Sequence, residues 1–407
     1  MATVSSTAPA ATARPRAPDA SLFLAAYALT AFGLVMIYSA SYVDAAKNFH
    51  NPAFYVTRQA IAALLGFCLM LAATYVPLRL VRALAPTALG ACLVFLALVL
   101  HPGLSRESGE AVRWVKVTSS YSFQPSELAK VVLIAFLALV GELYYQRKID
   151  YPAFIIRSGA ATAAVCFLVV AQPDLSTSVI IATSALLVAY MAGARRRELA
   201  IAFALGILAF IIVVASHDYM RQRLLAHFPG YRVASLSGDP RYQVNQCERA
   251  LRAGGLFGAG LCRGRGKFDF VPQCHNDTIV AIIGEELGFL GLITVISIFL
   301  WFVARGFSIG WRSPDVFNRL LACGLTATIA VQAGLNLLVV TNILPTTGVP
   351  LPFISYGGSS LVCTLLAVGL LLNVSRYTVL PEEGGSRARR DRQRRNRWTR
   401  LSRPRHR

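Results

Sequence analysis

Long apolar runs recur along most of this chain, and they constrain its fold more than any other feature. A run of about 20 apolar residues is what an α-helix needs to cross a hydrocarbon core of about 30 Å. Of the 407 residues, 55% are hydrophobic and 15% are charged, which is less charge than soluble proteins carry. We therefore predict an all-α, polytopic membrane protein with about ten transmembrane helices. The predicted spans are residues 21–43, 59–77, 84–101, 126–145, 154–172, 176–194, 198–216, 278–304, 318–343 and 356–376.

Positive charges in the short connections indicate how the chain is oriented. Cytoplasmic loops of membrane proteins carry an excess of Lys and Arg, and an even number of spans returns the C-terminus to the side of the N-terminus. We therefore predict a multi-pass membrane protein with both termini in the cytoplasm. The inside loops would then contain Arg79, Arg82, Arg147, Lys148, Arg195, Arg196, Arg197, Arg305 and Arg312.

The two chain ends differ in composition from the predicted membrane domain, residues 21–378. Residues 1–20 are rich in Ala, Pro and Thr, and residues 379–407 contain eleven Arg. We expect both ends to be disordered. The Arg-rich tail is typical of a segment that binds anionic lipid. No aromatic-rich nucleic-acid fold accompanies it, so we expect no nucleic acid as a partner.

One connection, residues 217–277, is far longer than the others and is predicted to lie outside the cell membrane. Its amphipathic patterning is typical of short surface helices, and it carries nine basic residues against five acidic ones. Long loops escape the positive-inside rule, so topology does not explain this excess. A phosphate-bearing ligand and anionic lipid headgroups are the two explanations, and the sequence leaves both open.

Three cysteines share this loop. In an oxidising compartment, Cys247–Cys262 or Cys262–Cys274 could be bridged, and reduced cysteines that only pack are the alternative. A zinc site built from these three and His275 is disfavoured, because no CxxC spacing supports it.

Polar residues also gather where spans are predicted to begin. RWVKVTSSYSFQPSELAK, residues 113–130, places Glu127 and Lys130 on one helix face at i,i+3 spacing, as part of a site or as a structural ion pair. AQPDLSTS, residues 171–178, contains Asp174, which could cap the next helix.

The stretch NILPTTGVPLPFISYGGSS, residues 342–360, contains three Pro and three Gly at membrane depth. Irregular backbone survives there only when it is buried in protein or lines a polar cavity. We therefore predict a re-entrant segment beside a polar cavity that opens to the outer face.

The stretch FVPQCHNDTIVAIIGEELGFLG, residues 270–291, carries carboxylates into an apolar run. Carboxylates in hydrocarbon are costly. Glu285 and Glu286 are therefore predicted to be structural polar residues with a cationic or hydrogen-bonding partner, for which Lys130 is the candidate. Asp277, at the membrane boundary, is either a helix cap or a functional carboxylate.

Taken in order, these segments resemble the SEDS family, which includes FtsW, RodA and SpoVE proteins. The family's signatures recur as GLVMIYSAS, FQPSELAK, QPDLSTS, GGLFGAGL, an HxD stretch leading to IIGEELGF, and TGVPLPFISYGGSS, within about residues 21–378. GLVMIYSAS and the span lengths are more similar to the FtsW branch than to the RodA branch.

The resemblance implies a peptidoglycan glycosyltransferase of the bacterial plasma membrane that polymerises lipid II at the outer face of that membrane, at the division septum. It implies a class B penicillin-binding protein and other divisome proteins as partners, and a divalent cation, Mg²⁺ or Mn²⁺, for which the sequence shows no complete ligand set. The family's catalytic aspartate falls on Asp277. Together with the polar signatures above, the expected substrate-binding residues are Arg113, Gln124, Glu127, Lys130, Gln172, Asp174, Arg252, His275 and Ser355.

The surroundings of Asp277 depart from the family pattern. Gln273, Asn276, Thr278 and Val280 stand where the family commonly has Glu, Thr and two Phe. A catalytically silent divisome scaffold is therefore one alternative. A lipid II flippase is another, because intramembrane charges also suit a transporter. A translocation path should carry polar groups to the inner face, whereas those found here cluster toward the outer half.

Overall fold

The computed structural model describes residues 16–101, 105–108, 111–116, 122–216, 218–227, 240–267 and 275–378. Residues 1–15 and 379–407, and with them most of the two predicted disordered ends, lie outside the described residues.

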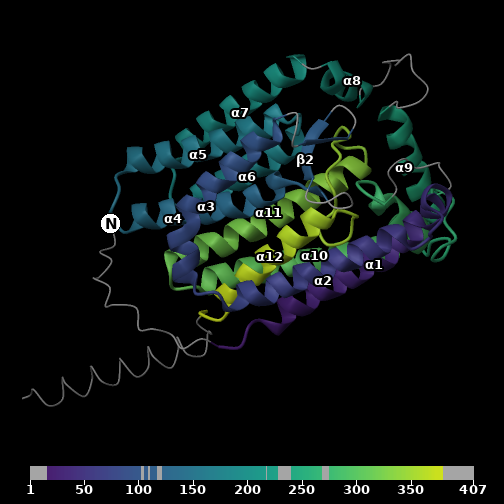
Figure 1. The fold of residues 1–407 in the computed structure, drawn as a ribbon, viewed down its shortest axis with the longest axis horizontal. Coiled ribbons are helices and arrows are strands. Elements are labelled where there is room, and N and C mark those ends of the chain that lie inside the picture. The colour runs from purple at the N-terminus through teal and green to yellow at the C-terminus, as the bar shows by residue number, and fades with distance from the viewer. Residues whose placement is uncertain are drawn as a thin grey trace, which may run out of the picture.

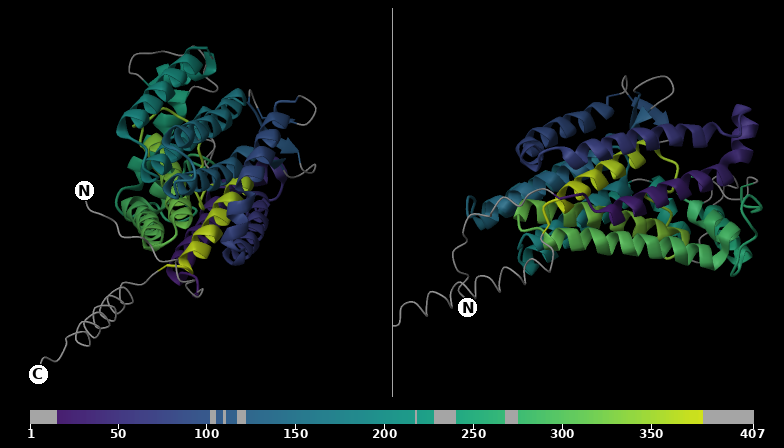
Figure 2. Two further views of the ribbon diagram at one scale, coloured as in Figure 1. Left: turned by 90° about the vertical axis from the view of Figure 1, so that its left-hand side faces the viewer. Right: turned by 90° about the horizontal axis from the view of Figure 1, so that it is seen from below.

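The described chain is a bundle of long apolar helices, which confirms the predicted all-α, polytopic fold class. Figure 1 shows the helices lying side by side along the long axis, and the right-hand view of Figure 2 shows the same arrangement from below. Nine described helices are long and apolar enough to cross a membrane: α1 (Ala20–Phe49), α2 (Phe54–Tyr75), α3 (Leu78–Val99), α4 (Pro125–Tyr145), α5 (Tyr151–Ala171), α7 (Arg196–Ser216), α10 (Ile279–Arg312), α11 (Val316–Val340) and α12 (Gly358–Ser375).

The remaining predicted span corresponds to the shorter apolar helix α6 (Leu175–Met191), which has 17 residues. At 1.5 Å per residue it is about 26 Å long. It packs against α4, α5 and α11, so it lies inside the bundle. Two polar helices, α8 (Asp218–His227) and α9 (Pro240–Gly254), come from the long connection, as its amphipathic patterning predicted.

The start of α1 and the end of α12 meet at one end of the bundle. Asp19 caps α1, and its backbone N–H donates to Ser375 Oγ at 3.0 Å. Arg305 of α10 pairs with the Asp19 carboxylate at 2.7 Å. We call this the basic end, and the opposite end the site end. The helix ends at the basic end carry Arg79, Arg82, Arg147, Arg195 and Arg312.

A small sheet at the site end was not predicted. Its strands β1 (Ser105–Ser108), β2 (Ala111–Lys116) and β3 (Ser122–Phe123) are antiparallel in the order β1-β2-β3. The sequence AVRWVK of β2 is rich in β-branched and aromatic residues, which favour strands. Long apolar runs, which mark helical spans, do not reveal so short a strand.

The Pro- and Gly-rich segment between α11 and α12 is the predicted re-entrant backbone, and it is buried in protein. Gly33 of α1 faces it so closely that a Cβ atom at Gly33 would lie 2.7 Å from Phe353 O. The Gln59 side chain of α2 donates to Ser355 O at 3.2 Å and accepts from Gly357 N at 3.1 Å. Protein groups thus satisfy backbone that could not face lipid.

Helix α10 is interrupted at Gly288, whose φ of 66° and ψ of −167° are non-helical. The 254–267 loop bridges the interruption. Its Ala259 and Gly260 N–H groups donate to the carbonyls of Glu285 and Glu286, both at 2.9 Å. Beyond the interruption, the N–H groups of residues 289 and 290 donate back to the carbonyls of residues 255 and 256. We call residues 279–287 the first half-helix of α10.

The GGLFGAGL signature is explained by this close approach of two backbones. A Cβ atom at Gly258 would lie 2.2 Å from Glu286 O, and one at Gly254 would lie 1.9 Å from Gly284 O. Any side chain at these positions would push the loop away from α10.

We predict that Gly288→Ala destabilises the fold. Its backbone conformation is essentially restricted to glycine and costs other residues about 1–3 kcal/mol, and the added Cβ would lie 2.4 Å from Gly258 N. The midpoint of thermal unfolding in detergent should fall. Gly159→Ala is the control, because a Cβ there meets nothing within 4 Å. Equal midpoints for the two variants would contradict the prediction.

Candidate functional site

Asp277 lies in the turn of residues 275–278, immediately before α10, and three other segments converge on it. Gln243 of α9 donates to Asp277 Oδ2 at 3.5 Å, and Asn336 of α11 donates to the Asp277 carbonyl at 2.8 Å. Gly348 faces the carboxylate, since a Cβ there would lie 3.9 Å from Oδ2. The side chain is only partly buried. Asp277 is therefore a partly accessible carboxylate, with its Oδ1 buried, held by tertiary contacts.

Two amides of α11, which the sequence analysis missed, tie this turn to the Pro- and Gly-rich segment. Asn336 Nδ2 also donates to Val349 O at 2.7 Å, and Gln332 Nε2 donates to Pro350 O at 3.0 Å. Both amides are buried. Their spacing of four residues on an otherwise apolar helix was the signal that could have found them, because it places both on one face.

The predicted pair of Glu127 and Lys130 is formed near the start of α4. The two charged groups are 2.9 Å apart, and each side chain is about 95% buried. Lys130 Nζ also donates to Gln332 Oε1 at 2.6 Å. The pair is thus connected through α11 to the segment that lies against Asp277.

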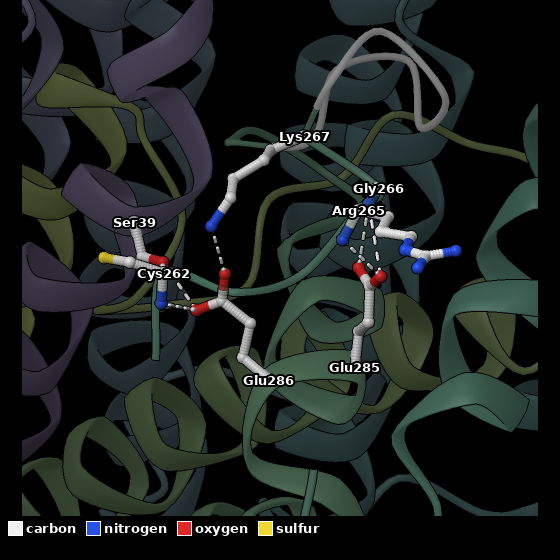
Figure 3. Close-up of polar contacts among 7 residues, drawn as sticks. All are labelled: Ser39, Cys262, Arg265, Gly266, Lys267, Glu285 and Glu286. Atoms are coloured by element: carbon white, nitrogen blue, oxygen red, sulfur yellow. Dashed lines mark hydrogen bonds and ion pairs between the residues drawn. The ribbon is translucent and has the colours of Figure 1, made fainter. Parts of the chain in front are cut away.

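This geometry corrects the predicted role of Lys130 as the partner of Glu285 or Glu286. Lys130 is engaged by Glu127 and Gln332 instead. The partners of Glu285 come from the 254–267 loop, and those of Glu286 come from the same loop and from Ser39 of α1 (Figure 3). Glu285 accepts from the backbone N–H groups of Arg265 and Gly266, at 2.6 and 3.0 Å, and Glu286 pairs with Lys267 at 2.7 Å.

A second group of predicted residues meets where α4 and α6 begin. Gln124 Nε2 donates to Asp174 Oδ2 at 3.0 Å, and Asp174 also accepts from the backbone of Thr177, as the helix-cap interpretation predicted. The Gln124 backbone N–H donates to Ser359 Oγ at 3.3 Å. Gln172 turns away from this group, since its Nε2 donates to Leu96 O of α3 at 2.8 Å.

His275 and Ser355 lie on either side of the contact between the turn and the Pro- and Gly-rich segment. The His275 ring packs on Tyr55 with centroids 4.3 Å apart, and its carbonyl accepts from Tyr356 N at 2.9 Å. Burial lowers the pKa of His275, which the Asp44 carboxylate partly offsets, so a neutral imidazole is favoured. Ser355 Oγ accepts from Leu351 N at 2.8 Å, inside its own segment.

Two predicted residues do not join this network. Arg252 is on the exposed side of α9, with 79% of its side chain accessible, and pairs with Glu248. Arg113 lies in the middle of β2, and its side chain is outside the described part of the structure.

The loop cysteines are not bridged where the structure describes them. Cys247 and Cys262 are both free thiols, so the Cys247–Cys262 bridge is wrong. Cys274 lies outside the described residues. Burial, followed by the nearby Asp277 carboxylate, raises the pKa of Cys247 to about 12.

We predict that the two described loop thiols differ in reactivity. At pH 8 in detergent, a maleimide should modify the exposed Cys262 and leave Cys247 unmodified, because a buried thiol with a pKa of about 12 stays protonated. Peptide mass mapping measures both. Modification of Cys247 at the rate of Cys262 in the folded protein would contradict the burial.

The described residues form no ready ligand set for the expected divalent cation. They contain no group of three or more His, Cys, Asp or Glu side chains that could hold a metal ion. We therefore assign no chemical step to a cation.

We predict that Asn336→Leu loosens the turn that carries Asp277. The substitution leaves the part-buried carbonyl of Asp277 and the buried carbonyl of Val349 without their amide donor, and an unsatisfied buried group costs about 1–3 kcal/mol. The unfolding midpoint should fall, and hydrogen exchange should rise at residues 275–279. Thr294→Val, which removes an exposed hydroxyl bonded only to its own helix, is the control and should change neither.

Comparisons with known proteins agree with this architecture. The model of the FtsW, RodA and SpoVE family, described as cell cycle protein, matches residues 19–380. A probable peptidoglycan glycosyltransferase FtsW of Geobacter metallireducens is 38% identical over 357 residues, which cover 88% of this chain and 94% of that protein. Stage V sporulation protein E of Bacillus subtilis is 34% identical over 370 residues, which cover 90% and 99%.

Two solved structures have the same fold. The rod shape determining protein RodA of Thermus thermophilus superposes with a TM-score of 0.66 at 26% identity, covering 89% of this chain and 98% of that chain. A chain of a peptidoglycan synthase complex, described for its coordination of polymerization and crosslinking, superposes with a TM-score of 0.71 at 29% identity, covering 88% and 98%.

Proposed function

This chain belongs to the FtsW, RodA and SpoVE family of cell cycle proteins, and we propose that it is a peptidoglycan glycosyltransferase that polymerises lipid II. The observation that carries this proposal is Asp277, a partly accessible carboxylate on a turn held by three segments beside a buried polar network. Relatives that carry the name peptidoglycan glycosyltransferase align over nearly the whole chain, which supports the same activity.

In the proposed reaction, Asp277 is the general base. The 4-hydroxyl oxygen of the acceptor sugar attacks the anomeric carbon of the donor, and the Asp277 carboxylate takes the hydroxyl proton. The bond from the anomeric carbon to the pyrophosphate oxygen breaks, and undecaprenyl pyrophosphate leaves with its electron pair. Attack from the face opposite the leaving group inverts α to β.

The leaving pyrophosphate gains negative charge and needs cationic groups near it. Arg263 and Arg265 are exposed on the loop beside α10, and Arg252 is exposed on α9. We assign this role to these guanidinium groups and to Arg113 on β2. Lys267, which the basic excess of the loop also suggested, is excluded because it is buried against Glu286.

We assign substrate contact to the remaining polar residues of the site end. The group around Gln124 and Asp174 and the pair of Glu127 and Lys130 both lie beside the Pro- and Gly-rich segment, through Ser359 and Gln332. His275 is the first residue of the turn of Asp277. In this proposal these polar groups hold the sugar hydroxyls in place.

The orientation follows from charge. The short connections at the basic end are rich in Arg, which supports placing that end in the cytoplasm and the site end outside. Division is the role we propose, because FtsW proteins are prominent among the relatives. The similarity to a stage V sporulation protein does not change the polymerising chemistry that we propose for this chain. A class B penicillin-binding protein is the proposed partner, in line with the solved complex that couples polymerization with crosslinking.

The distribution of polar groups favours a polymerase over a flippase. Beyond Lys130, α4 continues as the apolar sequence VVLIAFLALVG through residue 141. The hydroxyls of Thr326 and Thr328 on the facing α11 are bonded to carbonyls of their own helix. A translocation path would need free polar groups in this stretch, and these two hydroxyls are already bonded within α11.

We predict that Asp277→Asn abolishes glycan polymerisation while the protein still inserts, melts and binds its partner normally. Loss of a general base costs about 10²-fold or more in rate. The assay is polymer formation from labelled lipid II by purified protein with its cognate penicillin-binding protein. Asp150→Asn is the control, because Asp150 caps α5 at the basic end and Asn caps equally well.

Near-normal polymer from Asp277→Asn would overturn the base assignment. If the wild-type protein also forms no polymer but moves lipid II across vesicle membranes, the flippase proposal replaces the polymerase proposal. Absence of both activities would leave the scaffold.

A further inference from the structure

An ion pair is completely buried where the 254–267 loop meets α10. Lys267 Nζ lies 2.7 Å from Glu286 Oε1, and both side chains are 0% accessible. The second oxygen, Oε2, accepts from Ser39 Oγ of α1 at 2.5 Å and from Cys262 N at 3.1 Å. Figure 3 shows the lysine reaching down from the loop to the carboxylate. Glu286 thus has three donors from two parts of the chain, the 254–267 loop and α1.

In the sequence, the two paired residues stand at nearly equal distances on either side of Asp277, the proposed base. Lys267 precedes Asp277 by ten residues (277 − 267), and Glu286 follows it by nine (286 − 277). The ion pair therefore joins the two ends of the chain segment whose middle residue carries the carboxylate. Joining the ends of a loop restricts the conformations open to everything between them.

The interruption at Gly288 makes this restraint necessary. A continuous helix would hold the first half-helix rigidly to the rest of α10, but here the carbonyls of Glu285 and Glu286 bond to the loop instead. The neighbouring Glu285 carboxylate accepts hydrogen bonds from the loop backbone at Arg265 and Gly266. The contacts between the 254–267 loop and α10 therefore set the orientation of the first half-helix. They also set the orientation of the turn that precedes it.

We propose that Lys267 and Glu286 are positioning residues for the reaction. Their ion pair fastens the 254–267 loop across the interruption of α10 and so fixes Asp277 relative to the Pro- and Gly-rich segment. This inference rests on the proposed function of Asp277 as the base. Burial is consistent with such a role, because a buried pair is retained when both charges are fully hydrogen-bonded and is disrupted when either partner is lost.

The test compares Lys267→Met, Glu286→Gln and the double variant in the lipid II assay, using only folded protein recovered by gel filtration. Each single variant should lower kcat by about tenfold or more while KM changes little, because misplacement of a reacting group by 1 Å can cost about 10²-fold in rate. The double variant should be no worse than either single one, because the two residues act as one unit.

Glu142→Gln is the matched control. Glu142 is buried and pairs with Arg82 at 3.0 Å at the basic end, far from Asp277. This variant should lower the unfolding midpoint and leave the kcat of the folded fraction unchanged. If Lys267→Met behaves in the same way, the pair is only structural and the proposal is overturned.

Hydrogen exchange supplies a readout that does not depend on activity. In the single variants, exchange should rise at residues 254–267 and 277–286 and stay unchanged in α5. Unchanged exchange at 277–286 overturns the proposal even if activity falls. If wild type forms no polymer, the function of Asp277 is wrong while the exchange data still test the fastening.

Should Lys267→Met not fold, Glu285→Gln takes its place. The glutamine side chain keeps one oxygen that can accept from the backbone N–H groups of Arg265 and Gly266. It lacks the negative charge that strengthens both hydrogen bonds in the wild type. A smaller loss of kcat, with the same exchange pattern, is expected. Wild-type kcat together with wild-type exchange would contradict the proposal.

Discussion

Backbone groups inside a bilayer must find partners within the protein, because no water reaches them. Two parts of this bundle break the helical pattern, the Pro- and Gly-rich segment before α12 and the interruption of α10 at Gly288. Side-chain amides of Gln59, Gln332 and Asn336 serve the first, and the 254–267 loop serves the second. The turn of Asp277 lies between them, so its geometry depends on both sets of bonds.

This arrangement separates the tasks of the buried polar residues. Gln332 and Asn336 hold backbone, and the two glutamates of α10 hold the loop. Asp277 is left partly accessible at the end of the bundle, where a substrate that keeps its lipid in the membrane could place its sugars. An accessible carboxylate on a rigid support is what proton transfer to a fixed base requires.

Much of the fold could be predicted because its signals are local. Each transmembrane helix is marked by its own apolar run, and the re-entrant segment by its own Pro and Gly residues. The ion pair of Glu127 with Lys130 and the cap at Asp174 were also foreseen, since both partners lie within one turn of helix. The strand β2 was missed because its alternation is short and stands between long helical signals.

The sequence by itself determined the type of the membrane helices and the family, and it singled out Asp277 as the candidate base. Only the tertiary structure decided which residues the buried polar side chains pair with. Glu286 pairs with Lys267 rather than Lys130, and Asn336 reaches Asp277 from 59 residues away. Contacts between distant segments depend on how helices pack, and no local pattern encodes that. The interruption at Gly288 is of the same kind, because its freed backbone groups are stable only where the loop supplies their bonds.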